Sequence, residues 1–304
     1  MPARPVNVTV PAKINLVLHS APTARADGYH ELFTVFMAVN LTDKLTLTPT
    51  DNGQITVHVT GRDAGLVPVD GTDLAVRAAS LLRARWGQAN LGAQISIDKS
   101  IPVGGGMAGG SADAAAALRG CNQLWGLDTN DATLASLGAQ LGADVPFALL
   151  GGVAHGTNRG DVLSRLPAAG TYHWVLALAS HGLSTAAVFR HFDAMNTTTT
   201  STHPPQDGLL DALAAGDLAA VGQLLYNDLE APACQLRPEL AETLAFGRAL
   251  DGVAGAVMAG SGTTCAFLTQ TTDTARQVRD ALATLPQVDA ALIASGPVMG
   301  AQVV

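Results

Sequence analysis

Residues 101–118 read IPVGGGMAGGSADAAAAL, and the expected fold follows from this stretch. Five glycines fall within seven residues, and the alanine-rich run after them favours a helix. Just before them, residues 93–98 (AQISID) alternate polar and apolar side chains as a half-buried strand does. The order of strand, glycine loop and helix predicts an anion site, because glycines let the backbone approach a ligand and a helix start presents unpaired N–H groups.

Two familiar phosphate-binding loops do not fit this stretch. The P-loop requires Lys and then Ser or Thr after its last glycine, whereas this chain has Ser111 and Ala112. The spacing G-x-G-x-x-G at 104–109 meets the dinucleotide fingerprint, which also requires an acid at the end of the next strand to hold a ribose. The nearby acids, Asp128 and Asp131, lie in a predicted turn and helix cap. A nucleotide triphosphate loop of another type fits better, and a flexible surface turn is the alternative.

Length and composition limit the class of protein. With 304 residues, of which 48% are hydrophobic, the chain can form two domains with a sizeable core. A net charge of −8 without a basic run argues against nucleic-acid binding. The three cysteines lie far apart, which argues against a disulfide framework or a zinc site and suits a reducing cytoplasm. The sequence has no signal peptide and no apolar run of about 18 residues, so we expect no membrane association.

We expect an α+β protein with domains at 1–163 and 164–304. In the first, the patterns predict strands at 7–10, 14–18, 93–98 and 151–155, two more within 32–47 around a turn near 42–43, and helices at 73–86, from the glycines to 125, and at 133–141. In the second, they predict strands at 174–179, 253–258, around 267 and at 290–294, with helices from 181–190 onward and at 207–215, 217–229, 238–251 and 275–285. The polar stretch 196–205 is expected to be a mobile loop.

Several single residues have two interpretations from the sequence alone. The chain has only three lysines, so Lys13 and Lys99 could mark a need for a compact ammonium charge, although most lysines are simply exposed. Asp144 precedes Val-Pro, which is equally typical of a helix N-cap. Tyr29 and His30 follow a predicted turn, where they could pack and cap, or stack on a nucleobase and hydrogen-bond its edge.

The glycine stretch resembles the second motif of the GHMP kinases, which include galactokinase and the homoserine, mevalonate and phosphomevalonate kinases. Four stretches carry the resemblance in the order of the family: PAKINLVL at 11–18, RADGYHEL at 25–32, IDKSIPVGGGMAGGSADAA at 97–115 and LGADVPF at 141–147. A fifth, AGSGTTCAF at 259–267, resembles the third motif. The DGYHEL block is the most specific, because other GHMP kinases lack it; it resembles the branch of the family that acts on a cytidyl diphosphate sugar alcohol.

The resemblance implies a two-domain GHMP kinase fold, with an N-terminal domain like domain 2 of ribosomal protein S5 and a ferredoxin-like C-terminal domain. It implies ATP-dependent phosphorylation of the 2-hydroxyl of diphosphocytidyl-methylerythritol in the non-mevalonate pathway to isoprenoid precursors. Lys13 and Asp144 match the catalytic residues of the family. Asp144 would accept or orient the hydroxyl proton, and Lys13 would keep Asp144 ionised and neutralise charge on the transferred group.

The same resemblance implies the binding residues. ATP would be held by Lys99, Pro102, Val103, Gly104, Gly105, Gly106, Met107, Ala108, Gly109, Gly110, Ser111 and Ala112. The cytidyl substrate would be held by Asn15, Tyr29, His30, Phe36 and Phe189, although Phe36 and Phe189 also fit core positions. Mg²⁺ is expected as the counter-ion of ATP, with undefined ligands because Ala112 replaces a serine of the family; Ala108 likewise replaces a glycine.

Two other classes of protein use parts of this pattern. A dehydrogenase would need the ribose-binding acid, which is missing, and a non-catalytic relative would not need Lys13 and Asp144, which are both present. We therefore expect a cytoplasmic kinase, a monomer or homodimer, whose partner is a small-molecule substrate and neither nucleic acid nor a membrane.

Overall fold

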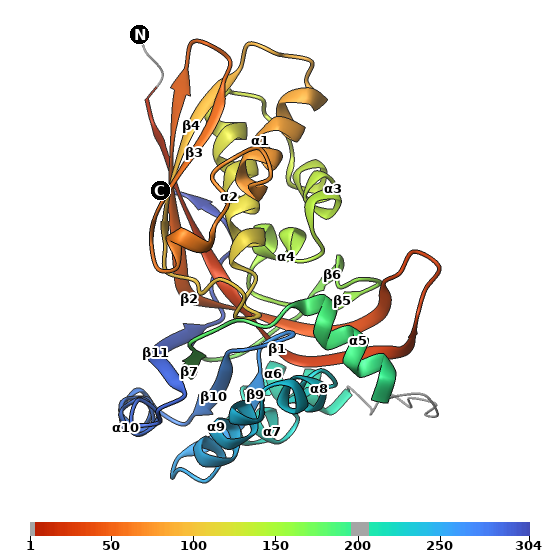
Figure 1. Cartoon of the computed structure of the whole chain (residues 1–304), viewed down its shortest axis with the longest axis vertical. Helices are drawn as coiled ribbons and strands as arrows, with labels where there is room; N and C mark the ends of the chain where they lie inside the picture. The colour runs from red at the N-terminus through yellow and green to blue at the C-terminus, as the bar shows by residue number, and fades with distance from the viewer. Residues whose placement is uncertain (1–3, 196–206) are drawn as a thin grey trace.

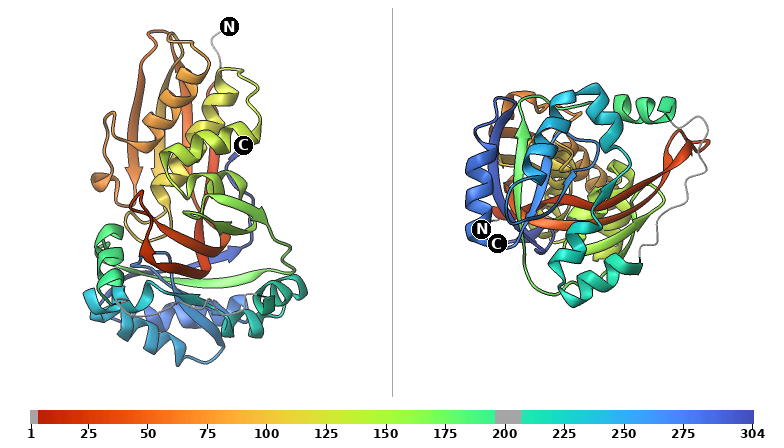
Figure 2. Two further views of the ribbon diagram at one scale, coloured as in Figure 1. Left: turned by 90° about the vertical axis from the view of Figure 1, so that its right-hand side faces the viewer. Right: turned by 90° about the horizontal axis from the view of Figure 1, so that it is seen from below.

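The computed structural model describes residues 4–195 and 207–304. The expected mobile loop at 196–205 lies outside these residues. Two sheets organise the chain, and Figures 1 and 2 show the second sheet with its helices beneath the first domain. The α+β expectation is confirmed. No helix of the described part has both the length and the apolar character needed to cross a membrane.

The first sheet carries the order β12-β1-β2-β4-β3, with β5 paired to β2 and β6, and β8 paired to β1. Long β1 and β2 form an antiparallel pair that extends from the first domain toward the second sheet (Figure 1). The strands are β1 (Val6–Ala24), β2 (His30–Thr50), β3 (Ile55–Gly61), β4 (Gly92–Lys99), β5 (Val153–Thr157), β6 (Val162–Arg165), β8 (Tyr226–Asn227) and β12 (Gln302–Val303).

The second sheet is antiparallel, with the order β11-β7-β10-β9. Its strands are β7 (Tyr172–Ala179), β9 (Val253–Met258), β10 (Cys265–Thr269) and β11 (Val288–Gly296). One buried cluster joins side chains of both sheets, among them Ile14 of β1 and Trp174 of β7, so the two domains share a continuous core.

Helices cover both sheets. The first sheet packs against α1 (Leu74–Arg85), α2 (Gly109–Leu124) and α4 (Val145–Leu150), and α3 (Asp131–Leu141) packs on these three helices (Figure 1). A short 3-10 helix, η1 (Ala64–Leu66), follows β3. The second domain holds α5 (Thr185–Met195), α6 (Asp207–Ala215), α7 (Leu218–Gln223), α8 (Glu230–Leu236), α9 (Pro238–Arg248) and α10 (Thr272–Leu282).

Two predicted breaks were wrong. Residues 7–18 belong to one strand, because the register shift after Pro11 bends β1 without ending it. Residues 32–47 also form one strand. Asp43 is buried there, where its carboxylate accepts hydrogen bonds from the backbone of Ser100 and Ile101 instead of forming a turn.

The predicted helix at 217–229 was also wrong in its second half. Helix α7 ends at Gln223, and the short strand β8 follows and pairs with β1. The predicted domain boundary at 163/164 falls inside β6, and the late strands β8 and β12 pair with β1, so both halves of the chain contribute to the first sheet.

Candidate active site

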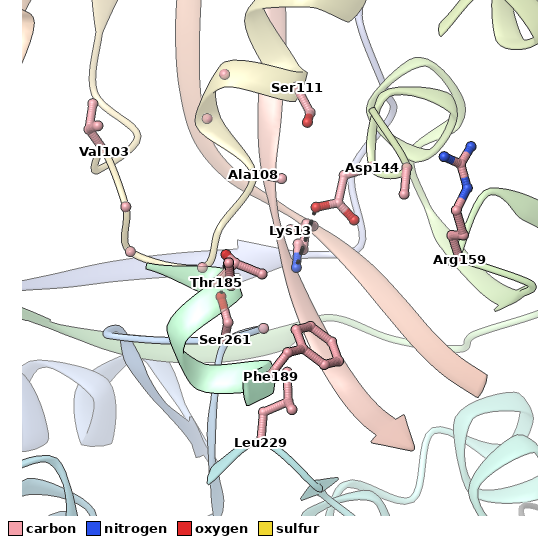
Figure 3. Close-up of a pocket in the computed structure, with 18 of the residues that line it drawn as sticks. Lys13, Val103, Ala108, Ser111, Asp144, Arg159, Thr185, Phe189, Leu229 and Ser261 are labelled. Atoms are coloured by element: carbon pink, nitrogen blue, oxygen red, sulfur yellow. Dashed lines mark hydrogen bonds and ion pairs between the residues drawn. The ribbon is translucent and has the colours of Figure 1, made fainter. Parts of the chain in front are cut away.

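A cavity of about 960 Å³ opens between the glycine loop and the β1–β2 pair. Residues from β1, β2, α2 and α5 line it, together with Ala143 and Asp144 just before α4 and Gly260 and Ser261 of the loop between β9 and β10. Figure 3 shows Lys13 and Asp144 in the middle, Val103 at one side and Arg159 at the other, with Phe189 nearby. The cavity thus brings together residues from all five motif stretches identified in the sequence, and other residues outside them.

The glycine loop ends where α2 begins, and the start of α2 is open. Ala108 is the N-cap residue, with φ 63°, and no side chain caps the helix. The first backbone N–H groups of α2 therefore lack a capping acceptor, and Gly109, Gly110 and Ser111 line the cavity. Together with the positive end of the helix dipole, they form a site for an anionic ligand.

Backbone contacts hold the glycine loop in place. Met107 accepts a hydrogen bond from the backbone of Lys13 at 3.3 Å, and Gly105 accepts one from Thr264 at 3.1 Å. Gly106 has φ +79°, and a Cβ there would lie 1.9 Å from the carbonyl oxygen of Ala259. Gly106 is therefore required for packing against the second domain, and this requirement exists without any phosphate.

Lys99 lies beneath the loop and is 2% exposed. Its ammonium contacts the carboxylates of Asp43 at 2.5 Å and Asp113 at 2.6 Å. Burial opposes the charge on Lys99, but the two carboxylates raise its pKa above the ordinary value. Although Lys99 borders the cavity, its ammonium is already engaged by two side chains, so its main contact is with the strand and helix that frame the loop.

Lys13 is buried in β1 and faces the cavity. Its ammonium donates to Asn15 Oδ1 at 2.7 Å, while Asn15 Nδ2 donates to Thr34 Oγ1 at 2.8 Å. Asn15 thus orients Lys13 and is itself held by β2. The ammonium also lies 5.6 Å from the ring centroid of Phe36, which stacks on Phe147 in a small core cluster. Burial lowers the pKa of Lys13, and the nearby Asp144 opposes that decrease.

Asp144 stands at the start of α4, but its side chain makes no capping hydrogen bond. Its Oδ2 lies 3.9 Å from the Lys13 ammonium, and the side chain is 34% exposed. The carboxylate is therefore paired with a buried cation on one side and open to the cavity on the other. This geometry is that of a proton acceptor or orienting group beside the open start of α2.

Aromatic side chains gather at the other end of the cavity. His30 is buried and stacks on Phe189 at 5.0 Å between ring centroids. Its Nδ1 lies 2.8 Å from the carbonyl oxygen of Ala21, and its Nε2 lies 3.1 Å from Asp193. Tyr29 is 54% exposed, which excludes the core interpretation of this residue. Both Tyr29 and Phe189 line the cavity.

The sequence did not identify every residue of the cavity. Arg159 and Asp193 border it, and so does Thr185, whose hydroxyl lies 2.8 Å from that of Ser261. Asn227 holds the loop carrying Ser261, because its Nδ2 donates to the carbonyls of Met258 and Gly260. Only Ser261 had a signal, in the GSG of the fifth stretch; the others have no local pattern. An apolar group near η1 was also missed: Leu66, Val67, Pro68 and Leu74.

The donor set suits a magnesium–nucleotide complex better than a free metal ion. Within residues 4–195 and 207–304, no group of three or more His, Cys, Asp or Glu side chains is arranged to hold a metal. Mg²⁺ commonly takes one or two protein carboxylates and completes its coordination with phosphates and water. Asp144 is an open carboxylate in the cavity, and the hydroxyl of Ser111 comes from the start of α2.

Comparisons with known proteins show the family of the chain. Residues 73–152 match the family described as GHMP kinases N terminal domain, and residues 209–286 match GHMP kinases C terminal. A protein of Cutibacterium acnes named 4-diphosphocytidyl-2-C-methyl-D-erythritol kinase is 48% identical over 301 residues, which cover 98% of this chain and 96% of that protein. A protein of the same name from Streptomyces coelicolor is 50% identical over 264 residues, covering 86% of this chain and 87% of that protein.

Solved structures extend the comparison to the fold. A crystal structure of 4-(cytidine 5'-diphospho)-2C-methyl-D-erythritol kinase superposes with a TM-score of 0.77 at 35% identity, covering 95% of this chain and 98% of the other. The homoserine kinase of Cytophaga hutchinsonii reaches a TM-score of 0.75 at 19% identity, covering 99% and 97%, and supports the fold alone.

Proposed function

Since the chain belongs to the 4-diphosphocytidyl-2-C-methyl-D-erythritol kinases, a branch of the GHMP kinases, we propose that the cavity described above is where ATP and the cytidyl substrate meet. The protein is an ATP-dependent kinase that phosphorylates 4-diphosphocytidyl-2-C-methyl-D-erythritol in the non-mevalonate isoprenoid pathway. One observation carries the assignment of the site: Lys13 and Asp144 form an ion pair between the open start of α2 and the aromatic end of the cavity.

ATP takes the side of the cavity next to the glycine loop. The open N–H groups at the start of α2 and the hydroxyl of Ser111 hold the β and γ phosphates. The apolar group near η1 lies on the same side as Val103 and receives the base. Lys99 acts on this side through Asp43 and Asp113, which anchor the loop, and not through a free ammonium. A Mg²⁺ ion bound with the phosphates would neutralise part of their charge; the Ser111 hydroxyl would supply a protein oxygen to it, and phosphate oxygens and water would complete its coordination.

The cytidyl substrate takes the opposite side, and its 2-hydroxyl reaches Asp144. The Asp144 carboxylate orients this hydroxyl and accepts its proton as the oxygen bonds to the γ-phosphorus of ATP and the bond to the β–γ bridging oxygen breaks. Lys13 stabilises the negative charge on the transferred group and keeps Asp144 ionised. Asn15 holds the Lys13 ammonium in position. Because Lys13 is only 6% exposed, little water surrounds its ammonium, which strengthens its interactions with the transferred group and with Asp144.

The aromatic end recognises cytosine. Tyr29 and Phe189 offer ring faces for stacking, and Phe36 forms the wall below the hydroxyl. His30 lines the same end of the cavity and supports the Phe189 ring from behind. The stacked pair of His30 and Phe189 is positioned before substrate binds, with His30 held by Ala21 and Asp193. We place the reaction in the cytoplasm, which fits three unpaired cysteines, and the enzyme acts as a monomer or homodimer.

A coupled assay of ADP release tests this function. The wild-type protein should release ADP from ATP when 4-diphosphocytidyl-2-C-methyl-D-erythritol is present, and should release far less with homoserine or mevalonate as the alternative hydroxyl donor. ADP release that is independent of the cytidyl compound, or that is faster with homoserine or mevalonate, would refute the proposal. Replacing ATP with NAD in a thermal-shift experiment supplies the control, because only the true ligand raises the melting temperature.

A further inference from the structure

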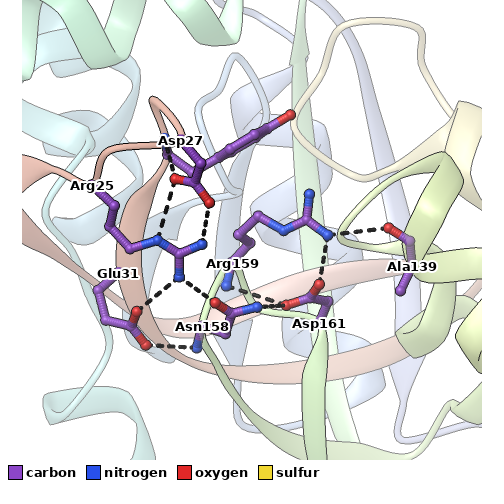
Figure 4. Close-up of polar contacts among 8 residues, drawn as sticks. Arg25, Asp27, Glu31, Ala139, Asn158, Arg159 and Asp161 are labelled. Carbon is purple, nitrogen blue, oxygen red and sulfur yellow. Dashed lines mark hydrogen bonds and ion pairs between the residues drawn. The ribbon is translucent and has the colours of Figure 1, made fainter.

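A network of polar contacts ties the loop that carries Tyr29 to a turn far away in the sequence. Residues 25–29 join β1 to β2, and residues 158–161 join β5 to β6 (Figure 4). Arg25 bonds to Glu31 at 3.0 Å and to Asn158, and Glu31 accepts a hydrogen bond from the backbone of Asn158 at 2.9 Å. The backbone of Leu32 donates to the carbonyl of Asn158 at 2.7 Å. Several contacts on each side fix the two segments against each other.

Arg159 of this turn is held in one orientation. Its Nη2 donates to Asp161 Oδ2 at 2.7 Å and to the carbonyl oxygen of Ala139 at 3.1 Å, at the end of α3 (Figure 4). Asp161 is in turn held by Asn158 Nδ2 at 2.7 Å. The Arg159 side chain is only 26% exposed. A guanidinium fixed by two acceptors on different elements loses little further freedom when it contacts a third group.

That third group is the ring of Tyr29. The guanidinium carbon of Arg159 lies 5.0 Å from the ring centroid, within the range of a cation–π interaction. The ring itself is more than half exposed, so the protein provides few other contacts to hold it. Arg159 therefore covers one face of the ring, and both residues line the cavity.

We propose that Arg159 is a positioning residue for nucleobase recognition, which holds the Tyr29 ring as one wall of the cytosine subsite while Asp161 and the carbonyl of Ala139 hold Arg159. This inference rests on the proposed function for the identity of the base. Arg159 acts through Tyr29 and does not touch the substrate. The competing arrangement is a direct contact between the guanidinium and the substrate diphosphate, and the two arrangements differ in how the effects of substitutions combine.

A double-mutant cycle separates them. Arg159→Met, Tyr29→Leu and the double variant are compared with the wild type for KM of the cytidyl substrate, KM of ATP and the dissociation constant of cytidine 5'-diphosphate measured by calorimetry. Arg159→Met should raise the cytidyl KM and this dissociation constant about fivefold and leave the KM of ATP unchanged. In the Tyr29→Leu background it should add less than about twofold, because the ring on which it acts is gone. Arg159→Lys keeps the cation and should restore part of the loss.

Arg165→Met is the matched control, since Arg165 comes from the adjacent β6, donates a hydrogen bond to the carbonyl oxygen of Leu150, and does not border the cavity. It should leave both KM values unchanged. Equal fivefold effects in both backgrounds would overturn the inference in favour of direct contact. A rise in both KM values together with a lower melting temperature would overturn it in favour of a purely structural role.

The outcomes for the two proposals are distinguishable. If the wild type phosphorylates the cytidyl substrate but the cycle shows no coupling, the positioning role fails and the function stands. If the wild type does not phosphorylate it but binds cytidine 5'-diphosphate with the predicted coupling, the function fails and the positioning role stands. If the wild type neither turns over nor binds cytidine 5'-diphosphate, both are refuted.

Discussion

Asp144→Asn separates the two interpretations of this residue, as a catalytic group or as a helix cap. The amide keeps the size of the side chain but cannot accept a proton. Removing a general base typically costs about 10²–10⁴ in rate, which is about 2.7–5.4 kcal/mol at 1.36 kcal/mol per tenfold. Because the Asp144 side chain makes no capping bond, no capping energy is lost. The amide oxygen can still face the Lys13 ammonium, which also keeps its hydrogen bond to Asn15, so the melting temperature should stay within about 1 °C of the wild type.

A real N-cap in the neighbouring helix provides the control. Asn130 caps α3, where its side chain accepts a hydrogen bond from the backbone of Thr133 at 2.9 Å. Asn130→Ala should cost about 1 kcal/mol of unfolding free energy, or roughly 2 °C in melting temperature for a chain of this size. Its kcat should not change, because Asn130 lies outside the cavity.

The assay is kcat from coupled ADP release, measured beside the melting temperature and the ATP dissociation constant for each variant. We expect Asp144→Asn to lower kcat by at least about a hundredfold at unchanged stability and ATP affinity. We expect Asn130→Ala to lower the stability and leave kcat unchanged. A kcat of Asp144→Asn within a few-fold of the wild type, or a loss of stability like that of Asn130→Ala, would refute the reasoning and leave Asp144 as a structural residue.

Three further predictions follow from the same site. The pKa of Lys13 is lowered, so kcat should fall as Lys13 loses its proton, at a pH below that at which an ordinary lysine titrates. Between the folded and unfolded pKa values the unfolded chain binds more protons, so the free energy of unfolding should rise with pH there, and a profile in which kcat and this free energy fall together would contradict the assignment. Gly110→Ala should stabilise α2 by up to about 1 kcal/mol but raise the KM of ATP, because its Cβ would enter the cavity wall 3.4 Å from Leu74; an unchanged KM would argue against phosphate binding there. Lys99→Met should cost about 3–5 kcal/mol in a denaturant titration, because Asp43 and Asp113 would remain buried without their cation, and a stability equal to the wild type would show that this cluster is not ionised.

The local patterns predicted most helices and strands but not their continuity. Proline and polar residues at 11–13 and 42–43 suggested breaks, yet β1 and β2 run through both. The reason is that a strand is stabilised by its neighbours: bulges absorb Pro11, and Asp43 is satisfied by the backbone of Ser100 and Ile101. Helix propensity likewise predicted too long a helix at 217–229, because the pairing of β8 with β1 depends on residues about 200 positions away.

From the sequence alone we could infer the strand, glycine loop and helix at 93–125, the importance of Lys13 and Asp144, and the family. Each of these inferences depends on residues that are neighbours along the chain. What those residues contact could be learned only from the tertiary structure. It placed Lys99 between Asp43 and Asp113, gave Gly106 a packing role against Ala259, and brought Arg159 over Tyr29. Such contacts join residues 14 to 153 positions apart, and no local pattern encodes them, since burial, charge pairing and ring contacts arise only when the sheets and helices pack.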